Sequence, residues 1–308
     1  MSPMSPVLVG FDGRPESVMA AGWAAREALM RGAPLRLVHA WEQSPQPYAT
    51  LAGAAVPQHP YGSARLLADM EALLIRRHPG LQIAADRVAG DPATALLTAA
   101  ADAGMLVLGS RGLGRVAGFL LGSVGRSVVA RAERPVVLVR ADTTLDAAGA
   151  DHGASARDVV VGVDLDQPDD SVLLFAFEAA ARRGAGLRVV HSWDPVGENT
   201  SAAGLPGVDD PAEGRTMTPG QASADLLRPW QDKFPDVSLT EQTVVGQAAS
   251  HLVDASRDAE LLVVGRASRH APIGPQTGPV TRVVLHHAVP PVAVIPHDLT
   301  PLADTPAA

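Results

Sequence analysis

The chain has no cysteine among its 308 residues, which excludes disulfides, thiolate catalysis and cysteine-ligated zinc sites. Aromatic residues make up only 4% of the chain and hydrophobic residues 46%, so the core must be built mainly from aliphatic side chains. Basic tracts are also missing, and the formal net charge is −8. A general nucleic-acid binder needs a cationic face for phosphates, so this charge argues against a nucleic-acid partner.

Long apolar runs are absent as well. No stretch is apolar enough over about 18 residues to span a bilayer. The first six residues, MSPMSP, lack the basic and apolar parts of a signal peptide. The sequence also contains no H-E-x-x-H zinc motif. We therefore expect a soluble cytoplasmic protein with no membrane partner and no metal site of its own.

The sequence repeats itself. Four blocks of the first half recur in the same order in the second half, the first two shifted by 152 residues and the last two by 156. The pairs are Val7–Asp12 with Val159–Asp164, Leu35–Trp41 with Leu187–Trp193, Leu106–Gly109 with Leu262–Gly265, and Pro135–Val139 with Pro291–Ile295. One net insertion of four residues after the second block accounts for the change of shift. We therefore predict a duplicated domain, in keeping with the length of the chain.

Within each copy, short apolar runs alternate with helical stretches, the pattern of a parallel sheet in an α/β domain. A helix is expected from about Ser17 to Arg31 and is ended by Gly32; its counterpart runs from about Asp170 to Gly184. Residues 42–62 and 194–220 are rich in proline, glycine and small polar residues, so we expect loops there. Residues 141–156 lack periodicity and predict a linker between domains at 1–145 and 155–300.

The most informative motif is Gly109-Ser110-Arg111-Gly112, followed after nine residues by Gly122-Ser123. It lies between the apolar run Met105–Leu108, a predicted strand, and a predicted helix that begins at Val124. Glycines at a strand end let a phosphate approach bare backbone, and a helix N-terminus offers free N–H groups and a positive dipole end. The motif is neither a Walker P-loop nor a dinucleotide fingerprint. The structural alternative is a set of ordinary loop glycines.

These residues resemble the glycine signature G-x2-G-x9-G-[S/T] of the universal stress protein family, in its ATP-binding branch. The runs VLVGFDG, LRLVHAW and PVVLV are similar to that family's first, second and last strands. The resemblance implies two tandem doubly wound domains, each with a five-stranded parallel sheet in the order 3-2-1-4-5. It also implies an ATP site made of Asp12, Ala40, Gly109, Gly112, Gly122, Ser123 and Val124. The alternative for Asp12 is a residue that forms a turn or caps a helix.

Three arginines near the motif are candidate phosphate contacts, because guanidinium pairs well with phosphate oxygens: Arg111, Arg115 and Arg126. Solvated surface charge is the alternative for each of them. The second copy keeps Asp164, Ser192, Gly265 and Gly278 at matching positions. It has Ser268 in place of the second glycine and Pro279 in place of Ser123, so we expect a weaker second site. Compensating contacts would come from Arg266, Arg269 and His270.

The resemblance implies a regulatory protein of stress or growth control that binds ATP mainly in domain 1, with Mg2+ only as a companion of the triphosphate. The glycine loop carries arginines and no carboxylate base, so we expect no catalytic residue and at most weak ATP hydrolysis. A slow ATPase or adenylyl-transferring enzyme and a nucleotide-free assembly module stay open. In the family the last strand commonly mediates dimer contacts, so Val136–Val139 and Val292–Ile295 are expected to join the two units as a pseudo-dimer within one chain. We also expect further self-association to a homo-oligomer, a dimer. No regulatory partner is identified.

Overall fold

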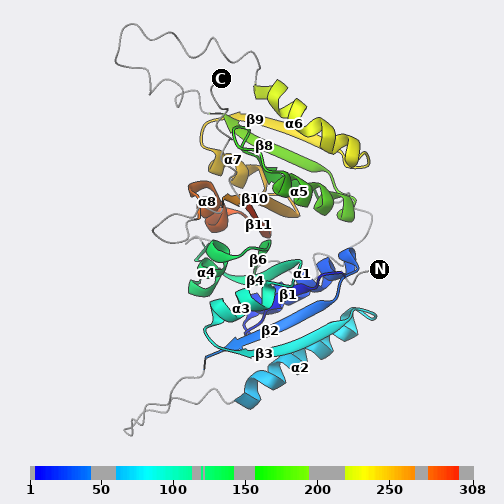
Figure 1. Cartoon of the computed structure of the whole chain (residues 1–308), viewed down its shortest axis with the longest axis vertical. Helices are drawn as coiled ribbons and strands as arrows, with labels where there is room; N and C mark the ends of the chain where they lie inside the picture. The colour runs from blue at the N-terminus through cyan, green and yellow to red at the C-terminus, as the bar shows by residue number, and fades with distance from the viewer. Residues whose placement is uncertain are drawn as a thin grey trace, which may run out of the picture. The chain divides into compact units, whose positions relative to one another are not determined.

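The computed structural model describes residues 4–42, 60–112, 119–120, 122–141, 157–193, 219–267 and 277–297. Its contacts divide the chain into two units, Met1–Asp151 and His152–Ala308. Each unit is an α/β fold in which helices follow strands along the chain (Figure 1).

The first unit contains a parallel sheet whose strands run in the order β3-β2-β1-β4-β6. Its elements are β1 (Val7–Gly10), α1 (Pro15–Arg31), β2 (Leu35–Trp41), α2 (Pro60–Arg77), β3 (Ile83–Ala89), α3 (Pro92–Ala100), β4 (Met105–Gly112), β5 (Phe119–Leu120), α4 (Ser123–Arg131) and β6 (Val136–Arg140). If the two-residue β5 is set aside, this is the predicted order 3-2-1-4-5.

The second unit repeats the arrangement, with parallel strands in the order β9-β8-β7-β10-β11. Its elements are β7 (Val159–Gly162), α5 (Asp170–Arg183), β8 (Leu187–Trp193), α6 (Pro219–Lys233), β9 (Leu239–Val245), α7 (Ala248–Ala255), β10 (Leu261–Ala267), α8 (Pro279–His287) and β11 (Val292–His297). The predicted duplication of a five-stranded parallel domain is confirmed.

The first strand of each unit is buried over its first three residues, with zero exposure for the three residues that begin at Val7 and the three that begin at Val159. Such strands read as continuous apolar runs because helices cover both faces of a parallel sheet. Alanines at 20, 21, 24, 25 and 28 have no exposed surface, so α1 packs through a face of small side chains that lets it approach the sheet closely.

The first helix of each unit ends as the sequence predicts. Gly32 follows α1 with φ 61° and Gly184 follows α5 with φ 60°, and each donates its N–H to a carbonyl of the last helical turn. A residue without Cβ adopts this left-handed conformation without strain, which is why the helices end at these glycines.

Two predicted loop boundaries need correction, and other predicted segments lie outside the described residues. The α2 and α6 helices begin at Pro60 and Pro219, inside ranges expected to be loops. The short β5 was not expected. The remaining loop residues, 43–59 and 194–218, and linker residues 142–156 lie outside the described residues, as do residues 298–308.

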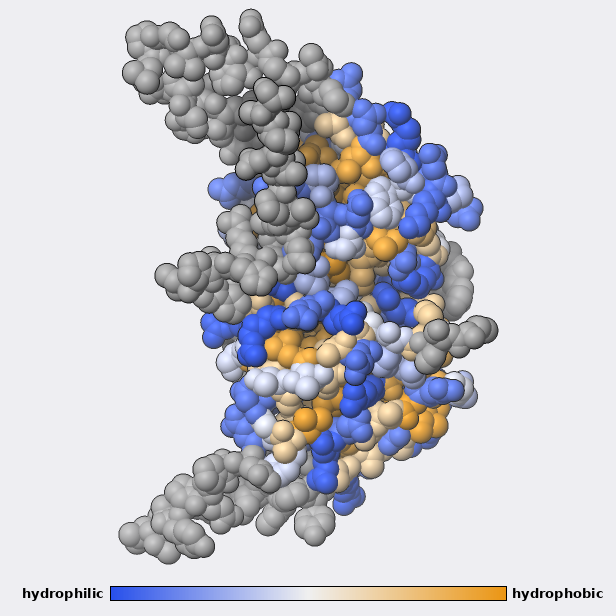
Figure 2. Space-filling model, viewed as in Figure 1, coloured by the Kyte–Doolittle hydropathy of each residue, from blue (hydrophilic) through white to orange (hydrophobic). Residues whose placement is uncertain are grey.

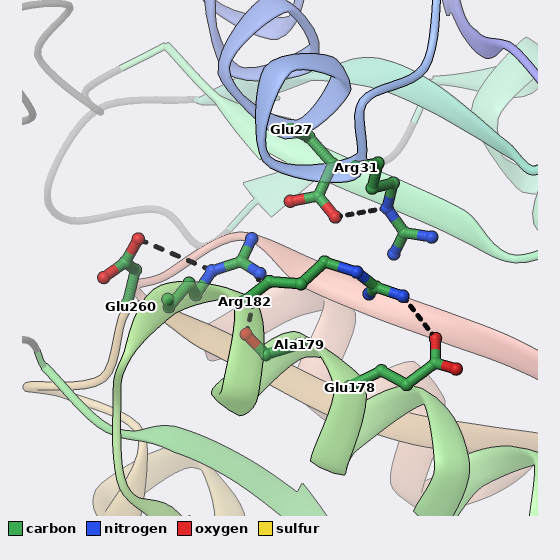
Figure 3. A network of polar contacts seen from close by, with 7 residues as sticks. Glu27, Arg31, Glu178, Ala179, Arg182 and Glu260 are labelled. Carbon is green, nitrogen blue, oxygen red and sulfur yellow. Dashed lines mark hydrogen bonds and ion pairs between the residues drawn. The ribbon is translucent and has the colours of Figure 1, made fainter. Parts of the chain in front are cut away.

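Ion pairs join charged side chains in each unit, and their carboxylates range from almost fully buried at Glu27 to more than one-third exposed at Glu178 and Glu260. In the first unit, Arg31 Nε lies 2.6 Å from Glu27 Oε1, and Glu27 is only 1% exposed (Figure 3). In the second unit, Arg182 pairs with Glu178 at 2.5 Å, and Arg183 Nε lies 3.5 Å from Glu260. All are pairs between oppositely charged groups, as burial of charge requires.

The visible surface of both units is mixed in hydropathy, with hydrophilic and hydrophobic residues interspersed over the face in Figure 2. Large apolar side chains that are exposed include Leu66 and Ile75 on α2 and Val245 on β9. Within the described part of the chain, no helix has the length and apolar character needed to cross a membrane.

Candidate functional site

Strand register places the predicted nucleoside residues of the first unit at the carboxyl ends of adjacent strands. Gly10 of β1 pairs with Val38 of β2, so Asp12 and Ala40 each lie two residues past this pair. On the other side, Val9 pairs with Val107 of β4, and Gly109 lies two residues past Val107. In parallel sheets this is the end at which ligands bind. Ala40 itself is half-buried on β2.

Asp12 takes part in the turn that leads into α1. Its carboxylate accepts a hydrogen bond from the Arg14 N–H at 3.1 Å, and Arg14 Nε lies 3.6 Å away. The Asp12 N–H donates to the Ser17 hydroxyl at 3.3 Å. The Asp12 side chain is 54% exposed, so it retains acceptor capacity for a ligand while it shapes the turn.

Gly109 lies inside β4, which continues to Gly112, and not in a loop after it. A Cβ at Gly109 would lie 2.5 Å from the carbonyl carbon and oxygen of Glu16 and 2.8 Å from the Ser17 nitrogen. The backbone of α1 therefore occupies the space that a side chain at this position would fill. Close approach of the α1 backbone requires glycine at this position, independently of any ligand.

The second motif glycine, Gly112, ends β4 in a short hairpin. Arg111 and Gly112 pair antiparallel with Leu120 and Phe119 of β5. The sequence gives no alternation long enough to reveal a two-residue strand. Residues 113–118, and with them the candidate contact Arg115, lie outside the described residues.

Gly122 is the N-cap of α4, and steric crowding of the kind seen at Gly109 does not explain why it is a glycine. Its backbone angles, φ −59° and ψ 164°, suit any residue, and a Cβ there would meet nothing within 4 Å. The fold therefore does not need glycine at this position. Aspartate or serine would cap the helix better. An acidic side chain here would, however, occupy the space in front of the helix N-terminus and repel an anion there.

The first turn of α4 keeps its N–H groups available. The first intrahelical bond runs from the Arg126 N–H to the Gly122 carbonyl at 2.9 Å, so the N–H groups of Ser123, Val124 and Gly125 have no carbonyl partner within the helix. Ser123 is exposed and Val124 is half-buried. Arg126 is exposed one turn into the helix. Backbone donors, a hydroxyl and a cation thus gather at one helix start, a favourable environment for an anion.

The second unit has a cavity of about 670 Å3 at the corresponding place. Asp164, Gly265 and Gly278, three of the four predicted second-site residues, line it. The fourth, Ser192, lies on β8 two residues past Val190, which also lines the cavity. Such a volume is typical of small-molecule sites. The altered glycine motif has therefore not filled the second site.

The wall of this cavity carries charged residues that differ from those of the first unit. Arg266, Arg282, Asp169 and His297 all line it. By the repeat offsets, Arg266 stands where the first unit has Ser110, Asp169 where it has Ser17, and His297 where it has Ala141, while Arg282 matches Arg126. Of these, only Arg266 was a candidate from the sequence, and Arg282, Asp169 and His297 were missed. A residue-by-residue alignment of the two copies would have revealed Asp169 and His297, because their counterparts in the first unit are of different types, and Arg282 as the counterpart of the candidate Arg126.

The start of α8 offers fewer donors than the start of α4. Pro279 is the first helical residue and has no N–H, so only Val280 and Thr281 have N–H groups without a carbonyl partner in the helix. The Thr281 hydroxyl donates to the Gly265 carbonyl at 3.0 Å and ties the helix to β10. Ser268, Arg269 and His270 lie outside the described residues.

Two histidines occupy equivalent positions near the end of the second strand of each unit, and both have structural roles. His39 Nδ1 lies 2.8 Å from the Phe11 carbonyl oxygen, and His191 Nε2 lies 2.8 Å from the Thr243 hydroxyl. Burial lowers the pKa of His191, although Glu241 acts in the opposite direction. Among the described residues, no group of three or more His, Asp or Glu is placed to hold a metal ion.

Comparison with known proteins agrees with this architecture. The model of the universal stress protein family matches residues 4–140 and again residues 156–296. Universal stress protein Rv2005c of Mycobacterium tuberculosis is 35% identical over 297 residues, which cover 94% of this chain and 96% of the relative. Universal stress protein Rv2623 of the same organism is 34% identical over 306 residues, 96% of this chain and 97% of the relative.

A solved structure shows the same fold over nearly the whole chain. The crystal structure of a universal stress protein from Archaeoglobus fulgidus has a TM-score of 0.68 and covers 94% of this chain and 98% of its own, at 16% identity. The chain therefore belongs to the universal stress protein family, and each of its two units matches the family separately.

Proposed function

We propose that this protein is an ATP-binding regulator of stress or growth control, with nucleotide held mainly by the first unit. In this proposal Asp12 and Ala40 contact the nucleoside, and Gly109 and Gly112 lie along the ribose and phosphates. The phosphates end at the start of α4, on Gly122, Ser123 and Val124, with Arg126 as a nearby cation. Mg2+ enters only with the bound triphosphate.

The observation that carries the proposal is the glycine N-cap of α4. Its backbone angles and open surroundings allow any residue, and yet the position has the one residue that leaves the helix N-terminus bare. By contrast, Asp91 caps α3 and accepts a hydrogen bond from the Thr94 N–H at 2.8 Å. A bare, uncapped helix start beside the carboxyl ends of β1 and β4 is suited to a phosphate.

Gly122→Asp in the full chain tests the site. The new carboxylate replaces a glycine cap by an equal or better one, so we expect the free energy of unfolding to stay the same or rise by a few tenths of a kcal/mol. ATP affinity measured by calorimetry should fall at least about 100-fold, because the carboxylate takes the phosphate position and repels it. An unchanged ATP affinity in the folded variant contradicts the proposal.

We also propose that the protein self-associates as a dimer, which the family resemblance implies. The strands to which the family resemblance assigns such contacts, β6 and β11, are each the terminal strand in the order of their own unit. Light scattering of the full chain at micromolar concentration tests this; a strict monomer refutes it. The domain limits 1–145 and 155–300 stay part of the proposal, and limited proteolysis that yields two stable fragments tests them.

A further inference from the structure

The outer edge of the second unit's sheet is formed by β9, a regular strand of seven residues. It pairs with β8 in unbroken register from Leu239 to Val245, and within the described part of the chain no strand pairs with its other side (Figure 1). Proteins usually protect such an edge with charged residues, proline or a bulge. Glu241 is the only charged residue of β9, which contains no proline. The edge is therefore open to pairing with a further strand.

Alternate residues of β9 direct their backbone groups away from β8. The Leu187 N–H of β8 donates to the Ser238 carbonyl at 2.8 Å, so the residue just before β9 faces β8. Because the direction reverses at every residue of a strand, Gln242 also faces β8. The residues that face outward are Leu239, Glu241, Thr243 and Val245. Among the described residues, only the Val245 carbonyl has a partner on this side, His251 Nε2 at 3.1 Å.

The corresponding edge strand of the first unit, β3, is protected by charge. Asp86 and Arg87 lie in the middle of this strand. By strand register, β9 has Gln242 and Thr243 at the same two places. Asp86 is also held by an ion pair, 2.6 Å from Arg36 Nε. Charged residues in the middle of an edge strand oppose pairing with another chain, and β9 lacks them at both places.

The sequence of β9 is complementary to a second copy of itself. When two β9 strands pair antiparallel about a two-fold axis at Gln242, Glu241 of one copy lies opposite Thr243 of the other. Both residues face outward, so their N–H and C=O groups bond each other directly, and no like charges stand opposite. At the strand ends, Leu239 lies opposite Val245. Val245 is 60% exposed, the highest value among the exposed large apolar side chains of the described residues, and this pairing covers it.

Two further features favour a second copy as the occupant of this edge. The same axis through β3 would place two Asp86 carboxylates directly opposite each other, which destabilises a strand pair, so β9 and not β3 is suited to this contact. In addition, α6 packs on β9. A two-fold axis perpendicular to the sheet keeps the α6 helices of both copies on one face, side by side, so the contact extends beyond the strands.

We propose that β9 is the self-association surface of this protein, and that two copies pair their β9 strands antiparallel about Gln242. The sheets of the two second units then continue into each other across the axis. This inference rests on the proposed self-association, and it names the surface and the register of that contact. It does not depend on a nucleotide in either unit.

The experiment compares the full chain with Gln242→Asp, which installs the aspartate of β3 at the axis. Gln242 is exposed, so the fold should be unaffected, while two carboxylates face each other in the dimer. The dissociation constant of the dimer, measured by sedimentation equilibrium at micromolar concentrations, should rise at least about tenfold. Gln82→Asp adds the same charge at an exposed position just before β3 and is the matched control, which should leave the dissociation constant unchanged.

Hydrogen exchange in the unmodified chain locates the contact. The amides of Glu241 and Thr243 should exchange more slowly as the protein concentration rises, because their N–H groups are bonded only in the dimer. The Gln242 amide faces β8 and should be protected at every concentration. If Gln242→Asp does not fold, Glu241→Pro takes its place with the same expected rise in the dissociation constant, because an edge strand tolerates proline where the N–H faces solvent.

Two results overturn the inference while self-association itself stands: a dimer whose dissociation constant is unchanged in Gln242→Asp, or a dimer in which exchange at Glu241 and Thr243 does not depend on concentration. Assembly into open polymers also overturns it, because a two-fold contact closes at two copies. A strict monomer overturns this inference together with the proposed self-association, and it is the result expected if β9 instead pairs with a strand of a different protein.

Discussion

Gly109→Ala separates two reasons for a glycine in the phosphate motif. A methyl group at Gly109 would lie 2.5 Å from the carbonyl group of Glu16 and 2.8 Å from the Ser17 nitrogen, both backbone atoms of α1. Backbone at the start of a packed helix cannot swing away as a side chain can. The substitution must therefore move α1 off β4, whether or not a nucleotide is bound.

The magnitude follows from overpacking of a closely packed interior, which typically costs about 1–3 kcal/mol. We expect about 2 kcal/mol here, because three backbone atoms lie within 3.0 Å of the new Cβ. The second unit supplies the matched control. A Cβ at Gly265 meets His297 and Val172 side-chain atoms at 2.8–3.2 Å, and these can rotate away. Gly265→Ala should therefore cost about 1 kcal/mol or less.

Native-state hydrogen exchange measures the two units separately in one full-length chain without nucleotide. In Gly109→Ala, the slowest amides of β1 and β4 should exchange roughly 30-fold faster, the equivalent of about 2 kcal/mol. The amides of β7 and β10 should be unchanged. Equal protection of β1 and β4 in Gly109→Ala and in the unmodified chain would show that α1 does not require glycine at this position, and the steric argument would fail.

Three further outcomes follow from the structure. ATP turnover should stay far below a typical enzyme rate of about 10 per second, and sustained turnover that is lost in Asp12→Ala would instead indicate an enzyme. Glu27→Ala removes the carboxylate 2.6 Å from the Arg31 guanidinium and should cost about 3 kcal/mol in the first unit by hydrogen exchange; normal protection there argues against a stabilising pair. Burial lowers the pKa of His191, so the unfolded chain takes up its proton first, and the stability of the second unit should fall as the pH drops below about 6.5. In His191→Gln, the urea midpoint should change less between pH 7.5 and 5.5 than in the unmodified chain. An equally steep fall of the midpoint would assign the acid sensitivity to other groups.

The sequence by itself determined the architecture of this protein. Repetition of four ordered blocks revealed the two copies, and the apolar runs marked the central strands because parallel strands are buried on both faces. Gly32 and Gly184 predicted the ends of the first helices because their left-handed conformation is a local property of the chain. The resemblance then supplied the strand order and the residues at the carboxyl ends of the strands. All of these features depend on local pattern or on the order of blocks along the chain.

Tertiary structure decided what the individual glycines do and what the second unit contains. Gly109 and Gly122 belong to one motif, yet α1 backbone crowds the first, while the space around the second is open. Asp169 and His297 are far apart in sequence, and no local pattern pairs them. They face one cavity because α5 begins, and β11 ends, at the carboxyl side of the second sheet. Contacts of this kind arise only when distant strands are brought into register, so they could not be predicted from the chain alone.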